Sequence, residues 1–187
     1  SKDHEILNIN IYMRYFSAFF LLTLATSSFL LAQSDCSGGR YENEIFPGHV
    51  LTSDITYGQN VSVNGSNTVL KMDVYQPQGD TLSVRPLILM AHGGTFISGD
   101  KAGSDIQPLA INFSKKGYVC ASINYRLGIR NLPLPGPDST DATEAVMRAV
   151  QDAKAAVRWF YKDARDSNNY RIDTNRIYFL GSSAGGF

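Results

Sequence analysis

The chain ends with Gly181-Ser182-Ser183-Ala184-Gly185-Gly186-Phe187, which places a serine at the centre of a Gly-x-Ser-x-Gly pentapeptide. The apolar run Ile177-Tyr178-Phe179-Leu180 comes directly before it, and its β-branched and aromatic residues predict a buried strand. A serine that attacks a carbonyl carbon must sit on a sharp strand-to-helix turn, where flanking glycines leave room for the crowded backbone. The pattern therefore predicts a nucleophile elbow with Ser183 as the nucleophile.

A second motif follows another predicted buried strand, Arg85-Pro86-Leu87-Ile88-Leu89-Met90-Ala91. The residues after this strand are His92-Gly93-Gly94-Thr95-Phe96. An acyl-transfer enzyme must offer backbone N–H groups to the oxygen that becomes negative in the tetrahedral intermediate, and glycines let the backbone come close enough. This segment is typical of an oxyanion loop, in which we expect His92 to have a structural hydrogen-bonding role rather than that of a catalytic base.

With both motifs present, the chain resembles the carboxylesterase and hormone-sensitive-lipase-like branch of the α/β-hydrolases. The resemblance runs from about Val69 to the last residue and rests on four segments: 92–99, 122–128, 152–159 and 181–186. It implies an acyl-enzyme on Ser183. It also implies an oxyanion hole made by backbone amides, for which the candidates are Gly93, Gly94, Thr95 and Ala184.

One position departs from the pattern of the family. Many relatives have a third glycine where this chain has Thr95. A threonine still donates its amide, so the hole should survive, but its β-branched side chain narrows the pocket. The substrate's acyl or alcohol preference therefore stays open.

The expected fold class is α/β: an α/β-hydrolase fold with a mostly parallel sheet and crossover helices, truncated after the nucleophile strand. Two alternating segments, Thr52 to Tyr57 and Thr68 to Tyr75, predict antiparallel strands that open the sheet. Helical spacing of apolar residues predicts a crossover helix over Asp105 to Lys116, followed by a strand over Val119 to Asn124. A capping-box pattern predicts that a long helix starts at Asp141.

Other tempting residues have simpler interpretations. Asp152 lies inside the long helix before the elbow, so we expect it to tether a helix or loop rather than to act as the triad acid. His49 precedes the catalytic segments and is expected at the surface. Cys120 lies in an apolar run, where a buried free thiol is expected, and a disulfide with Cys36 is disfavoured.

The N-terminal region predicts a signal peptide over residues 13–34. Met13-Arg14 is followed by an uncharged apolar run from Phe16 to Ala32, and the run is shorter than the roughly 20 residues that span a bilayer comfortably. Export is favoured over a membrane anchor, so we expect a secreted, periplasmic or extracellular protein without a stable membrane span after leader removal. Residues 1–12 are interpreted as upstream sequence or a gene-model error, and residues 35–187 as the N-terminal part of the hydrolase domain.

Composition adds limits on partners. The formal net charge is zero and no basic stripe is present, which makes nucleic acid an unexpected partner. The cysteines have no metal-ligand spacing, and serine ester hydrolysis needs no metal or organic cofactor, so we expect neither. The expected partner is a small-molecule or carbohydrate-linked ester substrate, and the oligomeric state stays open.

A working serine hydrolase also needs a histidine as general base and an acid that orients it. In the α/β-hydrolase order both follow the serine, whereas this sequence stops two residues after the pentapeptide. We therefore expect the chain to be part of a longer enzyme, and the sequence alone to be inactive. Two alternatives stay open: a serine peptidase of the same fold, and a non-catalytic binding domain that keeps the fold but lacks the triad.

Overall fold

The computed structural model describes residues 37–130 and 138–187. The predicted signal peptide and Cys36 lie outside the described residues. The chain divides into two compact units, residues 1–40 and 41–187. The described part of the first unit contains a short 3-10 helix, η1 (Ser37–Gly39).

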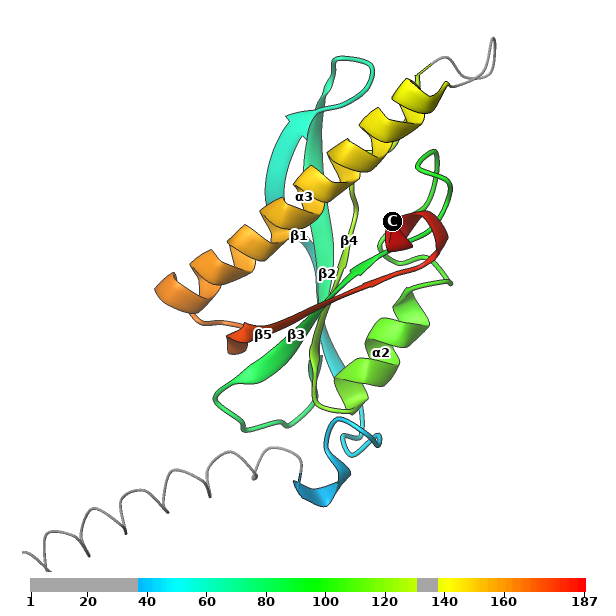
Figure 1. Cartoon of the computed structure of the whole chain (residues 1–187). Helices are drawn as coiled ribbons and strands as arrows, with labels where there is room; N and C mark the ends of the chain where they lie inside the picture. The colour runs from blue at the N-terminus through cyan, green and yellow to red at the C-terminus, as the bar shows by residue number, and fades with distance from the viewer. Residues whose placement is uncertain (1–36, 131–137) are drawn as a thin grey trace, which may run out of the picture. The chain divides into compact units, whose positions relative to one another are not determined.

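The second unit is built on one five-stranded sheet (Figure 1). Its strands are β1 (His49–Val61), β2 (Asn67–Pro77), β3 (Arg85–Ala91), β4 (Val119–Ile123) and β5 (Ile172–Gly181). Their order across the sheet is β1-β2-β4-β3-β5. β2 is antiparallel to both β1 and β4, whereas β3 is parallel to both β4 and β5. The antiparallel opening and the parallel pairing of the later strands agree with the predicted fold class.

The two central strands β3 and β4 are buried along their whole length. This is the expected burial for parallel strands that are covered on both faces. Cys120 on β4 is a buried free thiol, as predicted, and burial raises its pKa. β5 lies at the edge of the sheet formed by the described residues, where Tyr178 and Phe179 are 52% and 53% exposed. The strand over 177–180 is therefore present, but the prediction that it is buried is wrong in this structure.

Helices cover both faces of the sheet, with α2 (Gln107–Lys115) on one face and α3 (Ser139–Asp166) on the other (Figure 1). Alternation along β3 explains this: Leu87 and Leu89 share a core cluster with residues of α3, whereas Ile88 and Met90 pack in a second cluster with α2. No helix in the described ranges has both the length and the apolar character needed to cross a membrane.

The N-cap of the long helix α3 lies three residues before the predicted start of this helix. Asp138 is the N-cap: its carboxyl accepts hydrogen bonds from the amides of Thr140 and Asp141, at 2.8 and 2.9 Å. Asp141 completes the capping box by accepting from the Asp138 amide. The prediction that Asp141 opens the helix is therefore wrong, because a second carboxylate three residues upstream satisfies the first free amides.

Asp152 forms a buried ion pair that fixes the chain after β4. Its carboxyl lies 2.8 Å from the Arg126 guanidinium, and it also accepts the Arg126 amide at 2.8 Å. Both side chains are almost completely buried. The predicted role of Asp152 as a helix or loop tether is confirmed, and the structure shows that it joins α3 to the segment after β4.

Candidate active site

Ser183 lies on a tight turn at the end of β5. The amide of Ser182 donates to the carbonyl of Ala91 at 3.0 Å, and the chain then enters the short 3-10 helix η2 (Ser183–Gly186). Ser183 has a φ of +49°, a left-handed conformation that costs a non-glycine residue about 1–3 kcal/mol. The residue is exposed. A strained, exposed serine between a strand and a helical turn is the geometry of a nucleophile elbow.

The two outer glycines of the pentapeptide are required by close backbone contacts. A Cβ atom on Gly181 would lie 1.9 Å from the carbonyl oxygen of Gly185. A Cβ atom on Gly185 would lie 2.3 Å from the carbonyl oxygen of Ala91. No side chain fits at either position, so the turn can form only where both residues lack one.

The segment after β3 forms a left-handed loop. Gly94, Thr95 and Phe96 have φ values of +112°, +54° and +60°. The carbonyl of Gly94 accepts hydrogen bonds from the amides of Ile97 and Ser98, at 2.9 and 3.0 Å, which closes the turn. The residues from His92 to Phe96 are called the oxyanion loop below.

His92 is buried within the base of the oxyanion loop and is 1% exposed. Its Nδ1 lies 2.7 Å from the carbonyl oxygen of Gly93. Its ring stacks on Tyr125 with the centroids 4.5 Å apart, and the Tyr125 hydroxyl donates to the His92 carbonyl at 2.8 Å. These contacts suit a residue that supports the loop.

The oxyanion loop and the elbow are brought together by the pairing of β3 with β5. These strands are parallel neighbours, and Ala91 pairs with Gly181 at their carboxyl ends. The two motifs therefore follow adjacent strands at the same edge of the sheet. A Cβ atom built on Gly93 would lie 3.2 Å from the Cβ of Ser183, which shows how closely the segments approach.

The structure separates the candidate oxyanion donors into two groups. The Gly93 amide donates to the Asp105 carboxyl at 2.7 Å, so it is not free to bind a substrate oxygen. Among the described residues, the amides of Gly94, Thr95 and Ala184 donate no hydrogen bond. Ala184 lies in the first turn of η2, where amides have no partner within the helix. The inclusion of Gly93 is therefore corrected, and three candidate donors remain.

Asp105 is a site residue that the sequence reasoning missed, because it was counted only as the start of the crossover helix. In the structure it lies just before α2 and accepts the Gly93 amide. That hydrogen bond is the main reason why the pKa of its carboxyl lies below the usual value, and the Ser182 side chain adds to the effect. No sequence signal distinguishes it from Asp100, which also follows the His-Gly-Gly motif.

No general base is identified in the part of the chain that the structure describes. Its histidines are His92, which is engaged in the oxyanion loop, and His49, which lies on β1 at the opposite edge of the sheet from β5. Asp152 is engaged by Arg126. Within the same described ranges, no group of three His, Cys, Asp or Glu side chains could hold a metal ion.

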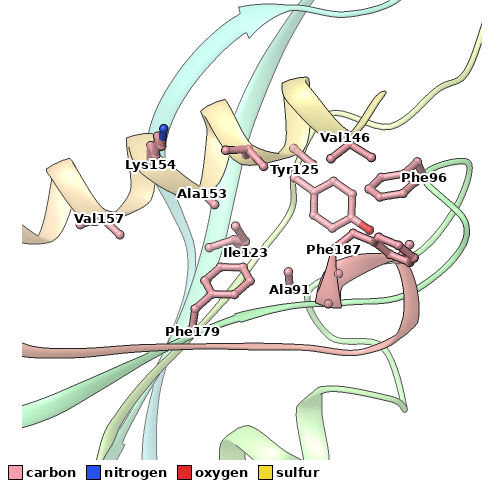
Figure 2. Close-up of a pocket in the computed structure, with 15 residues that line it drawn as sticks. Ala91, Phe96, Ile123, Tyr125, Val146, Ala153, Lys154, Val157, Phe179 and Phe187 are labelled. Carbon is pink, nitrogen blue, oxygen red and sulfur yellow. The ribbon is translucent and has the colours of Figure 1, made fainter. Parts of the chain in front are cut away.

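An apolar pocket of about 310 Å³ lies between α3 and the end of β5 (Figure 2). Figure 2 shows Phe179 and Phe187 on one side of it and side chains of α3 on the other. Ser183 is not among the lining residues. Ala184 and Gly185 of the elbow and Phe96 of the oxyanion loop do line it, so the pocket borders the Ser183 site.

Comparison with known proteins gives a family match and several relatives that are named as ester hydrolases. Residues 72–187, more than half of the chain, match the family described as BD-FAE. A Mycobacterium tuberculosis protein named probable carboxylic ester hydrolase LipM is 27% identical over 76% of this chain and 28% of its own length. Human carboxylesterase 3 is 28% identical over 65% of this chain and 20% of its own length.

Solved structures give the same result. The esterase Est2 from Thermogutta terrifontis superposes with a TM-score of 0.51 and 28% identity, over 74% of this chain and 41% of that one. The same esterase phosphorylated by paraoxon superposes with a TM-score of 0.52 and 26% identity, over 75% of this chain and 45% of that one. The chain thus spans less than half the length of these relatives.

Proposed function

The chain belongs to the BD-FAE family, and from that premise we propose that the whole protein is an exported serine carboxylester hydrolase that works through an acyl-enzyme on Ser183. One observation carries the proposal. The strained Ser183 elbow lies against an oxyanion loop, and the amides of Gly94, Thr95 and Ala184 are left without partners among the described residues. The ester hydrolases similar to this chain support the same reaction class.

The proposed reaction has two halves. The Ser183 hydroxyl attacks the ester carbonyl, its proton passes to a general base, and the carbonyl oxygen becomes an oxyanion held by the three free amides. The alcohol leaves with a proton, and the acyl group stays on Ser183. Water then attacks the acyl-enzyme and releases the acid. No described residue is assigned as the general base or as the acid that orients this base.

The proposed substrate is a small-molecule or carbohydrate-linked carboxylic ester. Thr95 lies within the oxyanion loop, where its own amide is a candidate donor and its side chain is β-branched. This side chain favours an ester with little bulk next to the carbonyl. No metal or organic cofactor takes part in the proposed reaction.

Hydrolysis of short-chain p-nitrophenyl esters by the whole protein tests the proposal. We expect turnover, together with covalent labelling of Ser183 by a fluorophosphonate, because both need a nucleophilic serine beside an oxyanion hole. Spectrophotometry of released p-nitrophenol and mass spectrometry of the labelled peptide measure the two outcomes. Ligand binding without turnover or labelling would show a non-catalytic binding domain instead.

Export is the second part of the proposal, and it rests on the charged start at Arg14 and the uncharged apolar run to Ala32. We expect the mature protein to begin near Gln33 or Asp35 and to be found outside the cytoplasm. N-terminal sequencing of the protein from the extracellular or periplasmic fraction measures this. A cytoplasmic product that still carries Met13 would contradict it.

A further inference from the structure

We propose that Asp105 is a positioning residue that holds the oxyanion loop and the nucleophile elbow in fixed relation to each other. The inference rests on the proposed function, because it concerns the same Ser183 site. It assigns to Asp105 a role in catalysis without contact with the substrate.

The carboxyl of Asp105 lies where the two halves of the site meet. It accepts the Gly93 amide of the oxyanion loop at 2.7 Å. The side chain of Ser182, the residue before the nucleophile, also helps to lower the pKa of this carboxyl. A Cβ atom built on Gly93 would lie 3.2 Å from each of the Asp105 carboxyl, the Ser182 carbonyl oxygen and the Ser183 Cβ, so the three segments converge at one point.

This bridge begins where the sheet ends. The last pair of the β3 and β5 ladder is Ala91 with Gly181, and one further backbone hydrogen bond joins Ser182 to Ala91. The oxyanion donors and Ser183 both lie beyond these contacts. The Asp105 carboxylate holds Gly93 at the point where it approaches Ser182 and Ser183, which supplies the next link. Charge-assisted hydrogen bonds such as this one are stronger than neutral ones.

The bridge also selects which amides remain for the substrate. By binding the Gly93 amide, Asp105 orients the peptide that leads into Gly94 and Thr95. Oxyanion stabilisation depends on donors about 2.7–3.1 Å from the developing charge. A misplacement of about 1 Å in such a site can reduce the rate about 100-fold.

The ionised form of Asp105 is the one that makes the bridge. The Gly93 amide, and then Ser182, hold the pKa of this carboxyl below its usual value. Because folding lowers this pKa, the ionised Asp105 carboxylate stabilises the folded protein at neutral pH. This stabilisation is lost as the pH falls through the lowered pKa. Asp105→Asn keeps the shape of the side chain and one acceptor oxygen but cannot carry the charge.

The experiment compares Asp105→Ala, Asp105→Asn and Ser182→Ala in the whole protein, with activity expressed per site labelled by a fluorophosphonate. For Asp105→Ala we expect kcat to fall at least about tenfold while KM changes less than about threefold, because transition-state contacts are lost and substrate binding is not. Asp105→Asn should recover only part of that loss, because it keeps one acceptor oxygen but not the charge. The double variant Asp105→Ala with Ser182→Ala should be little worse than Asp105→Ala alone, since both remove one bridge.

Asp173→Ala is the matched control. Asp173 also accepts a backbone amide, from Asn175 at 2.9 Å, and an Arg176 side chain at 2.6 Å, and the same kind of amide contact lowers its pKa. It lies at the start of β5, away from the elbow. Its loss should lower stability without changing kcat per labelled site.

The outcomes distinguish a failure of the proposed esterase function from a failure of the positioning role of Asp105. A wild-type protein that neither labels nor hydrolyses esters overturns the proposed function and this inference with it. A wild type that labels, together with an Asp105→Ala variant of unchanged kcat per labelled site, overturns the inference alone. If Asp105→Ala does not fold, the cycle of Asp105→Asn and Ser182→Ala decides, and independent, multiplying effects would contradict a shared bridge.

Discussion

Ser183→Ala in the whole protein is expected to lower kcat for p-nitrophenyl ester hydrolysis by about 10³-fold to 10⁶-fold. The alanine removes the oxygen that forms the acyl-enzyme, so the covalent route is lost, whereas binding and the oxyanion donors remain. The residual rate should be that of hydrolysis assisted by the oxyanion hole alone. Covalent labelling by a fluorophosphonate should disappear completely.

The neighbouring serine provides the discriminating comparison. Ser182→Ala removes a hydroxyl one residue away and should retain the covalent label at Ser183, although its turnover falls through the bridge to Asp105. Mass spectrometry of the labelled peptide distinguishes the two positions. Normal turnover or labelling of the Ser183→Ala protein would show that Ser183 is not the nucleophile.

Gly185→Ala is expected to have the second largest effect. The added Cβ would lie 2.3 Å from the Ala91 carbonyl oxygen and 2.7 Å from that of His92, both on the backbone, so the elbow must move away from the oxyanion loop. We expect kcat/KM to fall at least about 100-fold, as for a catalytic group displaced by about 1 Å. The free energy of unfolding should fall by about 1–3 kcal/mol, measured by denaturant titration.

Gly186→Ala is the control for this change, because it adds the same methyl group one residue later. There the nearest atom to the new Cβ would be the Gly181 carbonyl oxygen at 3.4 Å, an ordinary contact. Stability should change by less than about 0.5 kcal/mol. Equal losses in the two variants would mean that the close approach of Gly185 to β3 does not hold the elbow in place.

Local patterns in the sequence were sufficient to predict most of the strands and helices. The segment Arg85 to Ala91 predicts β3 with the bounds that the structure has, because a strand buried on both faces is mostly apolar, as residues 86–91 are. Asp152 was separated from the triad by its place before the serine, and the structure confirms it as the tether of Arg126. Ser183 was selected by its pentapeptide, and its positive φ agrees with the strained turn that such a pentapeptide forms.

Helix boundaries were less certain because several residues can cap a helix. Asp138 and Asp141 both have carboxylates that can accept free amides, and the structure has Asp138 as the N-cap and Asp141 as the third helical residue of the same capping box. The two residues have the same N-cap propensity, because both are aspartates. For this reason the predicted start at Asp141 was wrong.

Sequence alone determined which motifs are present, the strand behind each of them and the residue that would act as nucleophile, since each depends on neighbours a few residues away. Only the tertiary structure decided which loop amides are free. The pairing of β3 with β5 and the start of α2 bring the Asp105 carboxyl to the Gly93 amide and leave Gly94, Thr95 and Ala184 as candidate donors. Hydrogen bonds between segments far apart in the chain depend on strand order and backbone direction, which no local pattern encodes.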